Sequence, residues 1–139
     1  MLIIEWSKKY SVGIESMDNQ HKKIIELINK LSDAIDKGKG KKITGEILNE
    51  LKNYGETHFR DEEKLMKAVS FPKLDKQIKQ HRSFIKQLSD MIDVYEKSEK
   101  LMTLEIMNFM KSWFSDHIIQ SDNKYGKFIR SKLSKGAAK

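Results

Sequence analysis

Apolar side chains recur every three or four residues along four stretches of the chain, and short polar breaks separate these stretches. This period predicts amphipathic α-helices over residues 19–37, 41–67, 73–97 and 101–119. Gly38 and Gly40 mark the exit of the first helix. Pro72 separates the second helix from the third, because proline disfavours helical geometry in the residue before it. The connections are short, so neighbouring helices should run antiparallel in an all-α, up-down-up-down four-helix bundle.

The two ends of the chain depart from this pattern. Residues 1–17 lack the helical period, and Val12, Gly13 and Ile14 are expected to belong to an extended arm that lies on the bundle. Asp18 has the residue type and the position of an N-cap for the first helix. Towards the C-terminus, the apolar residues that predict a short amphipathic helix are Tyr125, Phe128, Ile129 and Leu133.

Composition narrows the class of protein. The 139 residues are expected to form one domain, residues 1–139, and the absence of cysteine excludes disulfides and thiolate metal sites. No apolar run approaches the roughly 20 residues that span a bilayer, and no signal peptide is recognisable. A cytoplasmic monomer without a membrane partner is therefore expected. The formal charge of +7 comes from lysines interleaved with acidic residues, without a recognition motif, so no nucleic-acid partner is expected either.

All four histidines of the chain interrupt the apolar stripes, one in each predicted helix. They are His21, His58, His81 and His117. A single inward histidine is usually a core residue with satisfied hydrogen bonds. Four of them, with Glu62 one turn after His58, would leave many buried polar groups in need of partners. A bound metal would satisfy these groups together.

The spacing of the polar residues supports a metal site. His58 and Glu62, four residues apart, share one helix face. His117 and Asp122 lie about 140° apart on a regular helix, so they can converge only if a π-bulge or a helix end intervenes. Two carboxylates among imidazoles suit a pair of first-row ions such as iron, whereas a single structural zinc would need only four ligands.

At this level of detail the chain resembles the hemerythrin family over nearly its whole length. The matching residues and motifs are Trp6, Val12-Gly13-Ile14, Asp18-x-Gln20-His21, Asn29-x-Leu31, Tyr54-x3-His58-Phe59-x2-Glu62-Glu63-x2-Met66, Phe71-Pro72, His81-x2-Phe84, Trp113-x3-His117-Ile118 and Asp122-x2-Tyr125.

The resemblance implies a non-haem di-iron protein that carries, stores or delivers dioxygen, with an O2-consuming enzyme or an electron donor as a partner. Its cofactor would be two iron ions joined by an oxo or hydroxo bridge. The resemblance assigns the first iron, with a vacant position for O2, to His21 and His58. It assigns the second iron to His81 and His117, and the bridging roles to Glu62 and Asp122. The implied O2 pocket consists of Phe59, Met66, Trp113, Phe114 and Ile118.

Two positions depart from the family pattern. Gln77 stands where the family has a third histidine on the second iron, four residues before His81. The Gln77 amide oxygen could ligate, a water held by Gln77 could take its place, or the second metal could stay five-coordinate. Each outcome should weaken metal binding. Phe114 stands where the family usually has leucine, and its larger ring would narrow ligand access or shield bound O2 from solvent.

The altered ligand set at Gln77 leaves alternative functions open. A second open position would favour a di-iron oxidase or peroxidase. An oxygen donor at Gln77 would also suit a metal-binding or metal-buffering protein that holds a harder ion such as manganese. A ferritin-like oxidase is disfavoured because its paired Glu-x-x-His motifs are absent. A metal-free helical interaction protein would leave the inward histidines and Glu62 unexplained.

Overall fold

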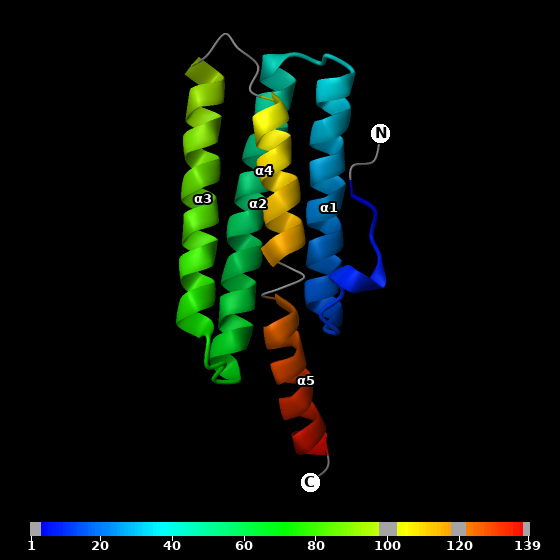
Figure 1. Cartoon of the computed structure of the whole chain (residues 1–139), viewed down its shortest axis with the longest axis vertical. Helices are drawn as coiled ribbons and strands as arrows, with labels where there is room; N and C mark the ends of the chain where they lie inside the picture. Colours follow the sequence, from blue (N-terminus) through cyan, green and yellow to red (C-terminus); the bar gives the residue numbers. More distant parts are fainter. Residues whose placement is uncertain (1–3, 98–102, 118–121, 138–139) are drawn as a thin grey trace.

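The computed structural model describes residues 4–97, 103–117 and 122–137. Four long helices form an antiparallel bundle, and a fifth extends past one end of it (Figure 1). The elements are η1 (Lys8–Tyr10, a 3-10 turn), α1 (Glu15–Asp36), α2 (Lys41–Ala68), α3 (Leu74–Lys97), α4 (Thr103–Asp116) and α5 (Asn123–Ala137). The predicted all-α four-helix bundle is confirmed, and so is the amphipathic helix near the C-terminus.

The start of α1 differs from the prediction. The helix begins at Glu15, with Ile14 at the N-cap, so the assignment of Asp18 as the N-cap is wrong. The Asp18 carboxylate instead accepts hydrogen bonds from Ser11 Oγ (2.6 Å) and from the backbone N–H of Val12 (2.8 Å). Asp18 therefore uses its capping chemistry to tie the N-terminal arm to the first turn of the helix.

The ends of α1 and α2 share one turn geometry. Gly38 has φ +60°, and the N–H of Lys39 donates to the carbonyl of Ala34. Ser70 has φ +56°, and the N–H of Phe71 donates to the carbonyl of Met66. Both patterns are Schellman motifs, in which one left-handed residue closes the helix. Phe71-Pro72 then leads directly into α3, which keeps α2 and α3 adjacent.

The buried apolar residues form two clusters. The larger one fills the space between α1, α2, α3 and α4. The smaller one lies at the end of the bundle where α5 packs, and consists of Val12, Met17, Met66, Phe71, Tyr125 and Ile129. The metal-site candidates lie where these two clusters meet, because Phe59 and Phe114 belong to the first and Met66 and Tyr125 to the second.

The N-terminal arm is held at several points. Ile4 exchanges two hydrogen bonds with the Asn29 side chain of α1, at 3.1 and 2.8 Å. Val12 is fully buried against α5, where the backbone of Gly126 approaches it so closely that a Cβ there would lie 2.4 Å from the Val12 carbonyl oxygen. The arm therefore joins α1 to α5. Among the described residues, no helix combines the length and apolarity needed to cross a membrane.

Candidate metal centre

Six of the predicted ligands converge inside the bundle. His21 comes from α1, His58 and Glu62 from α2, and His81 from α3. The remaining two are His117, directly after α4, and Asp122, directly before α5. All six side chains are buried, and Glu62, Asp122 and His21 are fully so. His58 and Glu62 are neighbours on one face of α2, one turn apart. The other four ligands come from different segments, and only the packing of the helices brings them to this pair.

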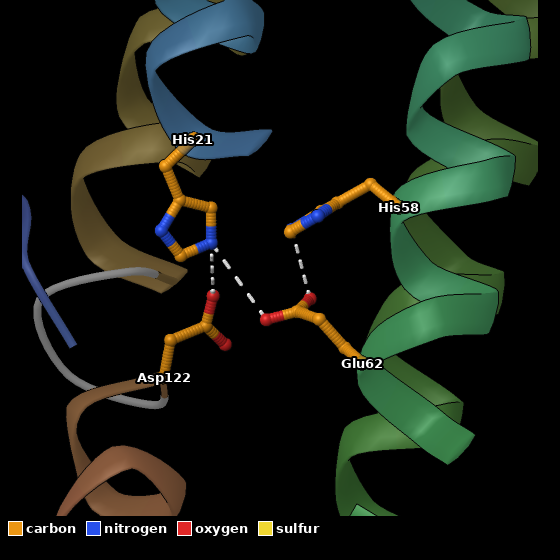
Figure 2. A group of neighbouring side chains, drawn as sticks. All are labelled: His21, His58, Glu62 and Asp122. Carbon is orange, nitrogen blue, oxygen red and sulfur yellow. Dashed lines mark ion pairs between the residues drawn. The ribbon is translucent and has the colours of Figure 1, made fainter. Parts of the chain in front are cut away.

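These residues form two overlapping groups. His21, His58, Glu62 and Asp122 bring ligand atoms within 4.8 Å of one another, and so do Glu62, His81, His117 and Asp122. Figure 2 shows the first group, with both carboxylates directed towards the space between the imidazoles. Because Glu62 and Asp122 belong to both groups, the two candidate metal positions are adjacent and have two carboxylates in common.

Each histidine turns its Nε2 atom towards a carboxylate. His58 Nε2 lies 3.0 Å from Glu62 Oε1, and His81 Nε2 lies 3.5 Å from the same oxygen. On the other carboxylate, His117 Nε2 lies 3.0 Å from Oδ1 of Asp122, and His21 Nε2 lies 3.3 Å from Oδ2. The four imidazoles therefore present the same ring nitrogen to a common centre.

The polar atoms at this centre test whether a metal fits. Nε2 of His21, His81 and His117, Oε1 of Glu62 and both carboxylate oxygens of Asp122 are buried without a well-oriented hydrogen bond to any described residue. Buried polar atoms are rarely left this way. A set of imidazole nitrogens and carboxylate oxygens at these separations is the donor set that first-row metal ions accept. The residues present therefore fit a pair of such ions.

Without metal, the buried carboxylates of Glu62 and Asp122 shift the pKa values of neighbouring histidines, and neighbouring histidines shift the pKa of Glu62. Burial by itself would lower the pKa of His21, but the adjacent Asp122 and Glu62 carboxylates raise this pKa to about 10. Burial would likewise lower the pKa of His117, and Asp122 raises it. Burial would raise the pKa of Glu62, but His58 and His21 hold it well below its usual range. For His81, burial prevails and lowers the pKa.

The backbone geometry at His117 and Asp122 bears on the five-residue spacing of these two ligands. Both residues have π-helical geometry. A π-turn adds a residue to each hydrogen-bonded ring and so rotates later side chains back towards earlier ones. Residues five apart can face the same centre in such geometry. The expected loosening of the helix between these two ligands falls on residues 118–121, which lie outside the described residues.

Comparison with known proteins identifies the relatives of this site. Residues 12–129 match the family model of the hemerythrin HHE cation binding domain. This chain belongs to the hemerythrin family. It is 31% identical over 125 residues to a bacteriohemerythrin of Clostridium acetobutylicum, covering 86% of this chain and 96% of that protein. It is also 31% identical over 134 residues to a bacteriohemerythrin of Pseudomonas aeruginosa, covering 96% and 86%.

Solved structures agree with this family. A crystal structure of wild-type hemerythrin superimposes with a TM-score of 0.84 at 24% identity, covering 90% of this chain and 96% of that chain. A structure described as a leucine-to-phenylalanine mutant gives a TM-score of 0.86 at 25% identity, covering 93% and 98%. These structures establish the helical-bundle fold, and the family model and the bacteriohemerythrin relatives establish the family.

Gln20 and Glu63, to which the sequence assigned no role, fix the tautomers of two of the four histidines in this hemerythrin site, His58 and His81. His58 Nδ1 lies 2.5 Å from Gln20 Oε1, and His81 Nδ1 lies 2.9 Å from Glu63 Oε2. Both partner atoms are acceptors. Gln20 Nε2 donates to Asp61, so the amide oxygen faces His58, and the partner of His81 is a carboxylate oxygen of Glu63. Each Nδ1 must therefore carry the proton, which leaves the Nε2 lone pair free for a metal.

Tyr125 supports a shared carboxylate from α5. Its hydroxyl donates a hydrogen bond to Glu62 Oε2, and its side chain is fully buried. Burial raises the pKa of Tyr125 well above its usual value, and Glu62 raises it further, so the hydroxyl stays a donor. The sequence signal was the pair Asp122 and Tyr125, which face one side of a helix.

Gln77 is 4% exposed and lies on α3 one turn before His81. Residues four apart on a helix share a face, so burial of both agrees with a position on the side that faces the bundle interior. Gln77 also lines a small cavity whose other walls include Phe71, Gln80 and Lys124.

The predicted pocket residues separate into two places. Phe59 stacks on His81 with ring centroids 4.0 Å apart, Trp113 stacks on His117 at 4.4 Å, and Phe114 is fully buried with its ring 6.4 Å from that of His21. Met66 is also fully buried, but it packs in the smaller cluster beside α5. Ile118 lies outside the described residues.

Proposed function

We propose that this chain is a di-iron protein that binds dioxygen and carries, stores or delivers it. The observation that carries the proposal is the pair of overlapping ligand groups that share Glu62 and Asp122. A single ion would use one group and leave the buried histidines of the other without a charge partner, which is costly. Two ions use all six side chains. Membership of the hemerythrin family supports iron as the metal.

In this proposal the ligands divide between two positions. His21 and His58 would hold one iron, His81 and His117 the other, and Glu62 and Asp122 would contact both. When bound, the iron pair would supply the reversible one-electron changes that O2 binding requires. Gln20 and Glu63 hold His58 and His81 in the metal-binding tautomer, and Tyr125 keeps Glu62 oriented.

A small apolar cavity lies among three of the predicted pocket residues. It has a volume of about 10 Å³ and is lined by Ile24, Leu51, Gly55, Phe59, Phe84, Met110, Trp113 and Phe114. Three of these, Phe59, Trp113 and Phe114, belong to the predicted pocket, whereas Met66 does not contribute. A cavity of this size is at the lower limit for one water-sized molecule, and its apolar lining disfavours water there. The Phe114 ring adds apolar area where the family usually has leucine.

Metal content and visible absorption test the proposal. Protein loaded anaerobically with ferrous iron should hold two irons per chain. On exposure to air it should develop a visible absorption band that disappears when O2 is removed. Glu62→Ala should lose both irons, because it removes a shared ligand. Glu56→Ala, a matched change on α2 outside both ligand groups, should retain two. If native protein that holds two irons develops no such band on exposure to air, O2 carriage is excluded.

Gln77 favours a second candidate, a di-iron oxidase or peroxidase. Its amide is a weaker ligand than an imidazole, so the second iron would keep a more open position. Gln77→His should then strengthen iron retention by about ten- to a hundredfold, as judged by competition with a chelator. It should also abolish any steady consumption of O2 or peroxide, while Gln87→His, an exposed control on α3, should not. Consumption that persists unchanged in Gln77→His would reject this candidate.

The same measurements address metal buffering. A buffering protein would bind manganese or another hard ion in preference to iron and show no O2-dependent band. Two irons per chain with a reversible band would contradict that function.

A further inference from the structure

A groove separates α3 from α4. The most extensive helix packing joins α1 to α2, α2 to α3 and α1 to α4, whereas α3 and α4 leave a groove of about 850 Å³ between them. Small-molecule sites in proteins commonly have volumes of about 300–1,000 Å³. The α3–α4 groove is thus large enough for an organic ligand, and it is distinct from the 10 Å³ cavity inside the core.

One wall of the α3–α4 groove is aromatic. Phe109 and Trp113 of α4 both line it, and both are only half-buried. The Trp113 ring is held by stacking on Phe84 at 4.0 Å and on His117 at 4.4 Å, and Phe109 stacks on Phe84 at 5.4 Å. A fixed, partly exposed indole and phenyl give a flat apolar surface on which another ring can stack.

The metal-site end of the groove is mainly basic. Lys76 and Lys79 line it from α3, one turn apart and exposed, and neither forms an ion pair within the described part of the chain. Asp116 on α4 is the acidic residue of the lining. Two cations therefore face one anion. Nearby, Gln80 Oε1 is buried with no hydrogen-bond partner among the described residues, so it can accept from a ligand.

We propose that the α3–α4 groove binds a flat aromatic molecule that carries a negatively charged group. The ring would lie on Trp113 and Phe109, and the anionic group would lie at Lys76 and Lys79. Because Trp113 stacks directly on His117, the occupant would be one ring removed from the candidate metal centre. The proposal concerns the protein surface and does not depend on which metal the centre holds, or on O2 binding.

Two flavin probes separate the two parts of this proposal. Flavin mononucleotide has a flat ring system and a phosphate, and riboflavin has the same ring system without the phosphate. The chain has two tryptophans, so Trp6→Phe leaves Trp113 as the sole indole fluorophore. In metal-free Trp6→Phe protein at low salt, flavin mononucleotide should quench Trp113 fluorescence saturably. Riboflavin should bind about tenfold more weakly, because it lacks the charge that the lysines attract.

Three variants locate the binding. Lys76→Glu with Lys79→Glu should lower the affinity for flavin mononucleotide by about tenfold or more and leave riboflavin binding little changed. Lys64→Glu with Lys67→Glu, the same charge change with the same spacing on α2, should leave both unchanged. Ser112→Trp, which fills the groove from α4, should abolish binding of both probes while the helical circular dichroism is retained.

Several results would overturn the proposal. These are the absence of saturable quenching by flavin mononucleotide, equal affinity for the two flavins, and equal loss of binding in the two double-lysine variants. A dimer in sedimentation experiments that Ser112→Trp dissociates would show that a second copy of the chain, rather than a small anion, covers this groove. Retention of two irons in the lysine variants would separate failure here from failure of the proposed function.

Discussion

The hydroxyl of Tyr125 donates a hydrogen bond to Glu62, across 63 residues of sequence. This contact links α5 to a carboxylate that belongs to both ligand groups. Asp122 begins the same segment, so the C-terminal helix supplies one shared carboxylate and orients the other. Docking of α5 and formation of the centre should therefore be coupled.

Tyr125→Phe should test this coupling. The change leaves Glu62 Oε2 buried without its donor, and a hydrogen bond to a charged group contributes about 1.5–3 kcal/mol. We expect a loss of that size in the unfolding free energy of the metal-free protein and about tenfold weaker metal retention. Denaturant titration and chelator competition measure the two effects.

Tyr95→Phe is the matched control. Tyr95 is also buried, at 1% exposure, but its hydroxyl has no hydrogen-bond partner among the described residues. Removal of that hydroxyl should be neutral or stabilising. Equal losses in the two variants would mean that the hydroxyl of Tyr125 contributes nothing specific.

Glu63 and Gln20 should set metal affinity without touching the metal. Glu63→Ala removes the acceptor of His81 Nδ1–H, and Gln20→Ala removes that of His58. Each should weaken metal retention by about ten- to a hundredfold. Glu63→Gln keeps an acceptor and should lose less. Chelator competition gives the affinities, and a Glu63→Ala variant with native metal affinity would contradict the assigned role.

The stability of the metal-free protein should fall at alkaline pH. The pKa of His21 is about 10 in the folded chain, and its ordinary value of 6.5 applies to the unfolded chain. A raised folded pKa stabilises fully below pH 6.5, and this stabilisation is lost as the pH rises towards 10. The pKa of His117 is raised as well, so its contribution also declines above pH 6.5.

Denaturant titrations between pH 6.5 and 10 measure this effect. One such histidine gives a slope of at most about 1.4 kcal/mol per pH unit. His21→Gln should flatten the decline. Metal-loaded protein should lack it too, because bound metal replaces the protons on the imidazoles. A metal-free protein with constant stability over this range would contradict the stabilisation of protonated His21 by Glu62 and Asp122.

Gly126 should be required where α5 crosses the N-terminal arm. A Cβ at this position would lie 2.4 Å from the Val12 carbonyl oxygen and 2.9 Å from Val12 Cβ. Both are parts of a buried, tethered segment, so Gly126→Ala should destabilise the protein by about 1–3 kcal/mol through overpacking.

Gly45→Ala provides the opposite expectation. A Cβ on Gly45 of α2 would meet the Tyr95 ring at 3.9 Å, an ordinary contact. Alanine in a helix interior is favoured over glycine by about 0.5–1 kcal/mol, so this variant should be more stable. Thermal and denaturant unfolding measure both variants, and a stable Gly126→Ala protein would show that the arm can move away from α5.

Much of the fold followed from local pattern. The helical period predicted four helices, and the first three agree with α1, α2 and α3 to within four residues. The predicted ends of the fourth, 101 and 119, lie outside the described residues, and Gly38 and Pro72 marked two of the breaks. The start of α1 was missed because Asp18 can cap a helix or bind an arm with the same oxygens, and local sequence cannot distinguish the two uses. The arm hydrogen bonds that decide between them are tertiary contacts.

For the candidate site too, some features could be predicted from the sequence and others could not. The sequence by itself determined which polar side chains interrupt the apolar stripes, because helical period is a local property. The tertiary structure alone decided that Glu62 and Asp122 are shared between two groups, and that Gln20 supports His58, 38 residues away, instead of its neighbour His21. The physical reason is that the period places a side chain on the inner face of its helix. Which inner-face residues then meet depends on how the helices rotate and slide against one another as they pack.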